Sequence, residues 1–146
     1  EDELHISKFM ELGKGQWKAS VKDLAGLRDQ FFEHMRSYDR IFSLRCLCKD
    51  PASWHYELVE IPKSLLEEAA QGKLSVQRKS TQTPKPGYCD VKDSKGLLRF
   101  QLYFDGGTER KLQIKHLRKD LCIVHATWVF ATEPEDPTEQ ALDASG

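Results

Sequence analysis

The chain has 146 residues and a formal net charge of −1, so it is long enough to bury a hydrophobic core and has no overall basic excess for nucleic acid. Hydrophobic residues make up 39% and charged residues 31%, a balance that favours a folded globular protein. No apolar run approaches the ~20 residues of a membrane-spanning helix, and no secretory leader is visible. We therefore expect a cytoplasmic protein without a membrane partner.

Charge is distributed unevenly along the chain. Five basic residues crowd 110–119, whereas 133–146 holds five acidic residues and no basic one. Because an acidic segment with prolines cannot bury enough apolar surface to fold, we expect a disordered tail over 133–146 after a single α+β domain over 1–132. A mildly basic body with an acidic tail is compatible with nucleic-acid binding.

The first half of the chain predicts two helices around a β-hairpin. The expected elements are a short strand over 1–6, a helix over 21–35, strands over 41–48 and 54–61, a helix over 63–71 and a short strand over 74–78. Ser20 is a typical N-cap for the first helix. Pro51 marks the hairpin turn because proline cannot donate to a strand ladder. Pro62 and Gly72 are typical of the start and the end of the second helix.

The second half predicts a β-meander. Its expected strands are 88–92, 97–104, 108–116 and 121–130, and the tight turns 93–96 and 105–107 carry Asp and Gly. A three-residue turn at 105–107 places Phe104 opposite Thr108 and Phe100 opposite Leu112. Extending this register through 93–96 places Cys89 opposite Phe100.

Alternation then assigns each side chain of the meander to one face of the sheet. The core face is expected to hold Cys89, Val91, Leu98, Phe100, Leu102, Leu112 and Ile114. The opposite face is expected to hold Asp90, Lys92, Arg99, Gln101, Tyr103, Glu109, Lys111, Gln113 and Lys115. The last strand is apolar on both faces, which predicts a central or covered position. The fold class is therefore α+β: a mainly antiparallel or mixed sheet, made of the hairpin and the C-terminal β-meander, with two helices packed on it.

Asp90-Val91-Lys92 is a candidate catalytic motif for phosphodiester cleavage. Such chemistry needs carboxylates that hold a divalent cation and often a lysine near the attacking water. The two-residue period of a strand puts Asp90 and Lys92 on one face, and Glu57 or Glu60 could supply a second acid. We take Glu57, Asp90 and Lys92 as the catalytic candidates, with Mg²⁺ held by Glu57 and Asp90. The alternative is a cross-strand ion pair between Asp90 and Arg99.

Asp105 with Gln113-Ile114-Lys115 looks like a variant of the same motif, but the expected register separates its parts. Gln113 is expected opposite Arg99, whereas Asp105 lies in the turn. At ~3.3 Å per residue these positions are roughly 20 Å apart, too far to share a metal ion. We therefore interpret Asp105 as a turn former.

The polar face of the meander is a candidate nucleic-acid contact surface. The expected contacts are Arg99, Gln101, Lys111, Gln113 and Lys115. Basic side chains bind phosphates, and glutamine and tyrosine add hydrogen bonds and stacking. The alternative is an ordinary solvated sheet face.

Cys46, Cys48, Cys122 and His125 include ligand types that suit zinc. Their spacing is poor, because residues three apart in a strand point to opposite faces. Small apolar packing is the alternative for the cysteines, and a hydrogen-bonded core histidine is the alternative for His125.

Four ordered strings carry a family resemblance. They are Gly15-Gln-Trp-Lys-Ala-Ser20, Tyr38-Asp-Arg-Ile-Phe-Ser-Leu-Arg45, Tyr56-Glu-Leu-Val-Glu-Ile-Pro-Lys63 and Phe104-Asp-Gly-Gly-Thr-Glu-Arg-Lys-Leu-Gln-Ile-Lys115. Over roughly 3–130 the chain resembles the part of type II restriction endonucleases, in the PD-(D/E)XK superfamily, that follows the catalytic strands. The resemblance implies contact with double-stranded DNA and Mg²⁺-dependent cleavage, in a possible homodimer.

The chain departs from that family's pattern because it has no Pro-Asp followed by Glu-X-Lys. Glu3-Leu4-His5 could end a catalytic strand with His in place of Lys, and its partner acid would then lie in a missing N-terminal part. The rival hypothesis is a non-enzymatic protein-interaction module that uses the exposed sheet face or the 21–35 helix.

Overall fold

The computed structural model describes residues 3–12, 20–107 and 109–131, without the side chains of 48–50. The chain forms two compact units, one from residues 1–41 and 61–123 and one from residues 42–60 and 124–146. The expected tail over 133–146 lies outside the described residues, and the expected single domain over 1–132 stays a prediction. No helix in the described residues is long and apolar enough to cross a membrane.

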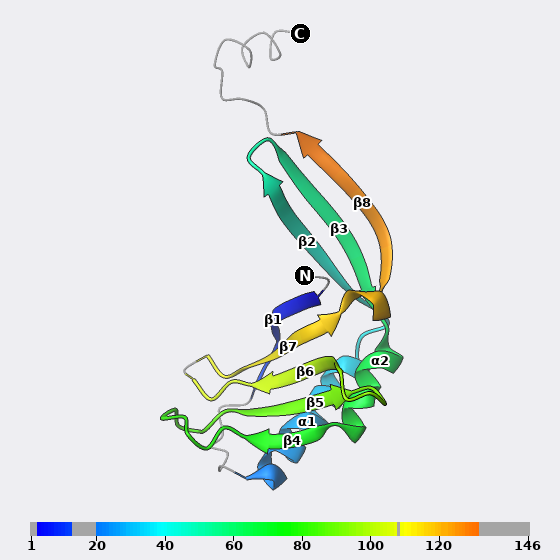
Figure 1. Ribbon diagram of the computed structural model, residues 1–146. Coiled ribbons are helices and arrows are strands. Elements are labelled where there is room, and N and C mark those ends of the chain that lie inside the picture. The colour runs from blue at the N-terminus through cyan, green and yellow to red at the C-terminus, as the bar shows by residue number, and fades with distance from the viewer. Residues whose placement is uncertain (1–2, 13–19, 108, 132–146) are drawn as a thin grey trace, which may run out of the picture. The chain divides into compact units, whose positions relative to one another are not determined.

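The first unit contains a five-stranded sheet in which every neighbouring pair is antiparallel. Its strands are β1 (Glu3–Glu11), β4 (Lys73–Val76), β5 (Gly87–Lys92), β6 (Leu98–Phe104) and β7 (Lys111–Arg118). They lie in the order β1-β7-β6-β5-β4 (Figure 1). The expected meander is confirmed for β5, β6 and β7, and β1 joins it on the free side of β7.

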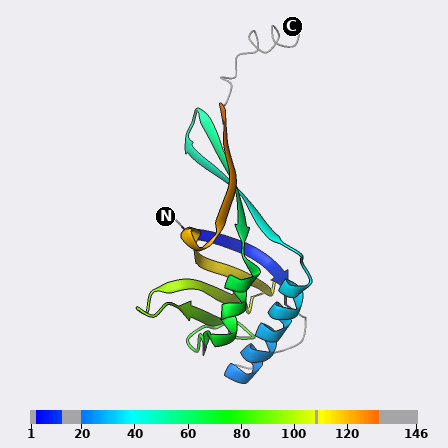
Figure 2. The same ribbon diagram turned by 90° about the vertical axis from the view of Figure 1, so that its right-hand side faces the viewer.

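The helices of the first unit lie on one side of this sheet (Figure 2). They are α1 (Val21–Arg36), α2 (Lys63–Glu67) and the 3-10 turn η1 (Glu68–Gln71); a second 3-10 turn, η2 (Lys119–Leu121), follows β7. The Ser20 hydroxyl accepts a hydrogen bond from the Asp23 backbone N–H at 3.2 Å, so the predicted N-cap is confirmed. One stripe of α1 is buried: Leu24, Leu27, Phe31, Phe32 and Met35. The α+β class is therefore confirmed.

The predicted core face of the meander is largely confirmed. The buried residues include Cys89, Val91, Phe100, Leu102, Leu112 and Ile114, whereas Leu98 is half-buried. Phe104 and Leu117 join them. The layer between sheet and helices is therefore apolar, and the opposite face of the sheet is left for polar side chains.

The predicted register, by contrast, is wrong. Phe104 pairs with Leu112 instead of Thr108, and Phe100 pairs with Val91 instead of Cys89. The pairing of Phe104 with Leu112 makes the turn longer than three residues. Within it, Asp105 accepts a hydrogen bond from the Gly107 N–H, and Arg110 adopts a left-handed φ of 46°. The shifts are four residues at the β6–β7 pair and two at the β5–β6 pair. Because both numbers are even, the side chains of these pairs keep their faces as far as the irregularity between Val91 and Lys92 in the β5–β6 ladder.

The second unit is built on a three-stranded sheet in the order β2-β3-β8. Its strands are β2 (Ile41–Asp50), β3 (Ser53–Ile61) and β8 (Ile123–Ala131). The predicted central or covered position of the last strand is wrong, because β8 is an edge strand and most of it is exposed. Some of the apolar side chains of β8 contact aromatic rings of β3. The Trp128 ring of β8 stacks on the Tyr56 ring of β3, with the ring centres 5.8 Å apart.

Candidate nucleic-acid interface

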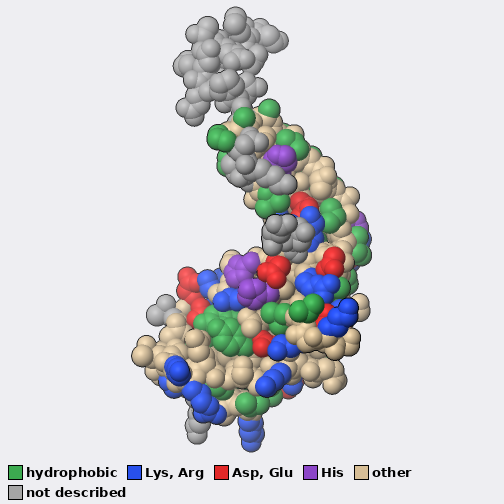
Figure 3. All heavy atoms as spheres, in the orientation of Figure 1, with side chains coloured by type: hydrophobic (Ala, Val, Ile, Leu, Met, Phe, Trp, Pro, Cys, Tyr) green, Lys and Arg blue, Asp and Glu red, His purple; other side chains and the backbone are tan. Residues whose placement is uncertain are grey.

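The five-stranded sheet has an outer face that the helices do not cover. Figure 3 shows this face, with basic side chains spread over it and histidines gathered over β1 and β7. Directly opposed residues of an antiparallel pair share a face, so the pairing of the strands orders these side chains into rows.

Two rows cross four strands of the sheet. The first row is Lys73, Asp90, Gln101 and Lys115. The second row is Ser75, Tyr88, Tyr103 and Gln113. The first row therefore holds three charged side chains and one amide, and the second row places two tyrosines beside it.

Short contacts hold the rows in place. The Gln101 side-chain amide donates to Asp90 Oδ1 at 2.7 Å. The Lys115 ammonium lies 4.1 Å from the centre of the Tyr103 ring, and the Tyr88 and Tyr103 rings lie 5.0 Å apart. Burial, with the carboxylate of Asp105 and with Tyr88, raises the pKa of Tyr103.

The predicted positions of Asp90 and Lys92 on one face are confirmed by the burial of β5. Cys89 and Val91 are buried, whereas Asp90 and Lys92 alternate with them on the outer side. The expected ion pair between Asp90 and Arg99 is wrong, because Gln101 lies opposite Asp90.

Arg99 lies at an irregularity in the β5–β6 ladder, where Val91 pairs with Phe100 and Lys92 with Leu98. This leaves Arg99 as an extra residue in β6. Its guanidinium makes two hydrogen bonds to the Glu68 carboxylate, at 2.7 and 3.0 Å. The Glu68 carboxylate therefore already neutralises much of the charge that Arg99 could offer a phosphate.

Lys111 is also engaged with a carboxylate. Its ammonium lies 2.8 Å from the Glu109 carboxylate, and this contact raises the pKa of Lys111. Of the five predicted nucleic-acid contacts, Gln101, Gln113 and Lys115 lie in the two rows, whereas Arg99 and Lys111 lie in ion pairs.

Glu57 lies in β3, in the second unit, whereas Asp90 lies in the first. Its side chain is buried, and its Oε1 accepts hydrogen bonds from two guanidinium nitrogens of Arg45, at 3.0 and 2.6 Å. Glu60, the alternative acid, lies 2.6 Å from His125. A metal site shared by Glu57 and Asp90 stays a prediction.

Asp105 lies closer to Gln113 than the predicted register implied. Tyr103, not Arg99, lies opposite Gln113, and the Asp105 N–H donates to the Lys111 carbonyl at 3.1 Å. Asp105 therefore lies opposite Lys111, two residue pairs further along the ladder than Gln113, and is a diagonal neighbour of Gln113 at ~7–8 Å instead of about 20 Å. Its role as a turn former is confirmed by the Gly107 N–H, which donates to Asp105 Oδ1 at 2.8 Å.

The described residues contain no cluster of three or more His, Cys, Asp and Glu side chains that could hold a metal ion. Cys46 is exposed, and Cys122 Sγ lies 3.7 Å from the Arg118 carbonyl oxygen. Cys46 and His125 belong to the second unit and Cys122 to the first. The zinc hypothesis therefore gains no support from the described side chains.

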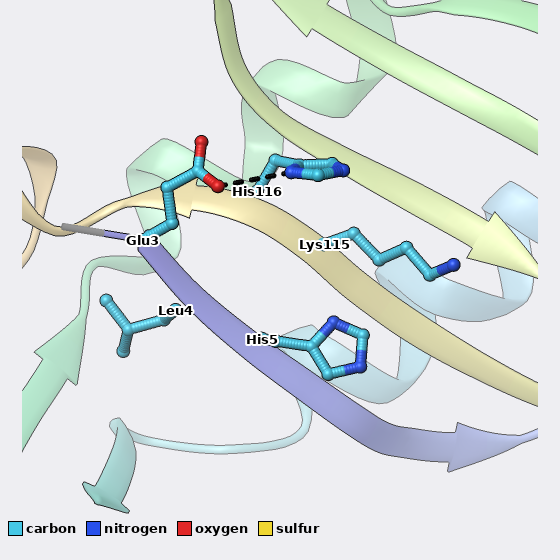
Figure 4. Close-up of a pocket in the computed structure, with 5 residues that line it drawn as sticks. All are labelled: Glu3, Leu4, His5, Lys115 and His116. Carbon is cyan, nitrogen blue, oxygen red and sulfur yellow. Dashed lines mark hydrogen bonds and ion pairs between the residues drawn. The ribbon is translucent and has the colours of Figure 1, made fainter. Parts of the chain in front are cut away.

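The structure has a pocket on the outer side of β1 and β7 that the sequence did not predict. It is a cavity of about 420 Å³ lined by Glu3, Leu4, His5, Lys115 and His116 (Figure 4). The sequence carries one signal of it: the apolar residues of β7 are spaced by two at first and then by three, which indicates a break in strand alternation.

Comparison with known proteins gives a coherent result. A family model described as a type II site-specific deoxyribonuclease matches residues 1–130. The type II restriction enzyme SmaI of Serratia marcescens is 50% identical over 131 residues, which cover 90% of this chain and 51% of that enzyme. The chain thus spans about half the length of this curated relative. No solved structure matches the chain.

Proposed function

From the premise that this chain belongs to the SmaI family of type II site-specific deoxyribonucleases, we propose that it supplies a DNA-contacting surface to a DNA-cleaving enzyme. The surface is the outer face of the five-stranded sheet. The observation that carries this proposal is the pair of rows that ends at Lys115 and Gln113. Lysines suit the phosphate backbone, whereas amide and phenol groups suit base edges and sugars.

The basic side chains proposed to bind phosphates differ in whether they already hold an ion pair with a carboxylate. Lys73 and Lys115 lie in the first row, and Lys92 is exposed at the end of β5. Arg99 and Lys111 already hold ion pairs with Glu68 and Glu109, which offset part of their charge. We therefore assign the stronger phosphate contacts to Lys73, Lys92 and Lys115. Weaker contacts are assigned to Arg99 and Lys111.

For cleavage we propose Asp90 and Lys92, with Mg²⁺ as the cofactor. Mg²⁺ in such sites is held by one or two carboxylates together with substrate phosphates, and it stabilises the developing charge and activates water. Asp90 fits, because its carboxylate is engaged by an amide and not by a cation. Glu57 fits less well, because a metal would have to replace Arg45. Lys92 would neutralise the charge of the attacked phosphate.

The corrected register supports Asp105 as a second candidate acid, with Gln113 and Lys115 on the neighbouring strand. Aspartate-to-asparagine substitutions distinguish the two candidate acids. Each substitution removes the negative charge but keeps a side-chain oxygen that can accept the hydrogen bond seen in the structure. Asp90→Asn keeps an acceptor for Gln101, and Asp105→Asn keeps one for the Gly107 N–H. Mg²⁺-dependent nicking of plasmid DNA should be lost in one variant and retained in the other. Unchanged nicking in both variants would exclude both acids.

DNA binding is tested by fluorescence anisotropy of a labelled duplex at two salt concentrations, with and without Mg²⁺. Each phosphate contact that is lost should reduce the slope of log K against log salt by about 0.9. We expect this for Lys73→Gln and for Lys115→Gln. Lys22→Gln is the matched control, because Lys22 is exposed on α1 and carries the same charge. Absence of salt-sensitive binding by the unaltered protein would refute the proposal.

A homodimer is part of the proposal, because cutting both strands of a duplex calls for two active sites. The rival protein-interaction module keeps the sheet face as its surface. The apolar stripe of α1 is not accessible to a protein partner, because it is buried against the rest of the first unit. Partner binding that resists salt would favour the rival.

A further inference from the structure

The pairing of β1 with β7 contains a β-bulge. The register changes at this point: Leu4 pairs with Leu117, and Ile6 pairs with Ile114. His5 on β1 is therefore opposed by two residues of β7, Lys115 and His116. Such a two-against-one arrangement is common beside functional sites because it redirects side chains.

The bulge places three side chains capable of positive charge on the outer face. Ile114 and Leu117 are fully buried although they are three residues apart, so both residues between them are displaced from the core. His116 adopts a φ of 55°, a left-handed conformation that is costly for a residue other than glycine. Figure 4 shows the side chains of His5 and Lys115 lying side by side on neighbouring strands.

Three of the five residues that line this pocket are able to carry positive charge. Burial lowers the pKa of His5, and Lys115, His116 and Lys111 on β7 lower it further. The one carboxylate in the lining belongs to Glu3, which lies 3.2 Å from His116 Nδ1. A ligand that brings two negative oxygens would relieve the repulsion among these groups.

We propose that His5, Lys115 and His116 form a pocket for one phosphate group of the DNA backbone. This inference rests on the proposed function, because Lys115 also ends the first row of the DNA-contacting face. A backbone that follows the row Lys73, Asp90, Gln101 and Lys115 reaches the pocket without a break.

The chemistry of the lining favours an anion over a metal ion. The described residues hold no three-ligand group, and a lysine ammonium within the lining repels cations. The cavity of about 420 Å³ admits a phosphate together with water. Glu3 opposes the phosphate, so its removal should have the opposite effect to the removal of a cation.

The DNA arm of the test uses anisotropy titrations from pH 8 to pH 6. The unaltered protein should bind more tightly as pH falls, because the bound phosphate favours protonation of His5. His5→Gln should flatten this dependence, and His116→Asn should weaken binding; Asn is chosen because it tolerates a positive φ. Glu3→Gln should tighten binding, and Lys22→Gln should change nothing. An unchanged pH profile for His5→Gln, together with unchanged affinity for His116→Asn, would overturn the pocket while the DNA-binding proposal stands.

The second arm does not depend on DNA. Inorganic phosphate is titrated into the labelled protein while the side-chain resonances of its five histidines are followed by NMR. We expect His5 and His116 to shift and Lys115→Gln to weaken the effect. A shift in the absence of any DNA binding would support a phosphate pocket and refute the DNA-contacting face. Zn²⁺ binding in place of phosphate, or no shift at either histidine, would overturn the pocket.

Discussion

Glu57 offers a test that separates a structural carboxylate from a catalytic one. Its side chain is 7% exposed and that of Arg45 is 17% exposed, so the ion pair between them is largely removed from water. Breaking a buried pair by removing one partner costs about 3–5 kcal/mol, because the remaining charge is uncompensated. Since Arg45 retains some exposure, we expect Glu57→Gln to lose about 3 kcal/mol of unfolding free energy.

Urea unfolding followed by tryptophan fluorescence is a suitable assay, because Trp54 and Trp128 lie in β3 and β8 of the same sheet. The control is the double variant Arg45→Met with Glu57→Leu. It should recover most of the loss, because an apolar pair of similar volume can replace a buried ion pair. A loss below about 1 kcal/mol for Glu57→Gln, together with loss of DNA cleavage, would refute the structural role and support a metal ligand.

Three further predictions concern the core, a helix cap and a thiol. Phe100→Ala should cost about 3–5 kcal/mol in thermal or urea unfolding, because this ring is fully buried, and a cost under 1 kcal/mol would contradict the packing. Ser20→Ala should cost about 1 kcal/mol by removing the acceptor for the Asp23 N–H, and Ser20→Asn should restore most of it. Burial raises the pKa of the Cys89 thiol, so alkylation at pH 8 should modify exposed Cys46 far faster than Cys89 until urea unfolds the chain. Equal rates in the folded protein would contradict the burial of Cys89.

Faces could be predicted from the sequence, but the register could not. The two-residue period of a strand assigns each side chain to a face, and an error of two or four residues leaves that assignment intact. The register depends on the turn, and the left-handed Arg110 and the Asp105 side-chain hydrogen bond gave no local signal of a longer loop. Asp90 therefore pairs with Gln101, whereas the predicted register paired it with Arg99.

The candidate site was harder to predict, because ion-pair partners lie far apart in the chain. Arg99 forms its ion pair with Glu68, which lies in the 3-10 turn η1 and is 31 residues away in the sequence. The β1–β7 bulge joins residue 5 to residues 115 and 116, which no window of sequence brings together. The two sheets could not be separated either, because an apolar strand has the same pattern whether helices cover it or not.

The order of strands in the second unit has a consequence for synthesis. β3 is the middle strand of β2-β3-β8, but about 60 residues separate its end at Ile61 from the start of β8 at Ile123. At about 5–20 residues per second, a ribosome takes roughly 3–12 s to make that stretch. During this time the β2–β3 hairpin is a marginal structure with an open edge. The nascent chain is therefore most exposed to pairing with a wrong strand in the seconds before β8 emerges.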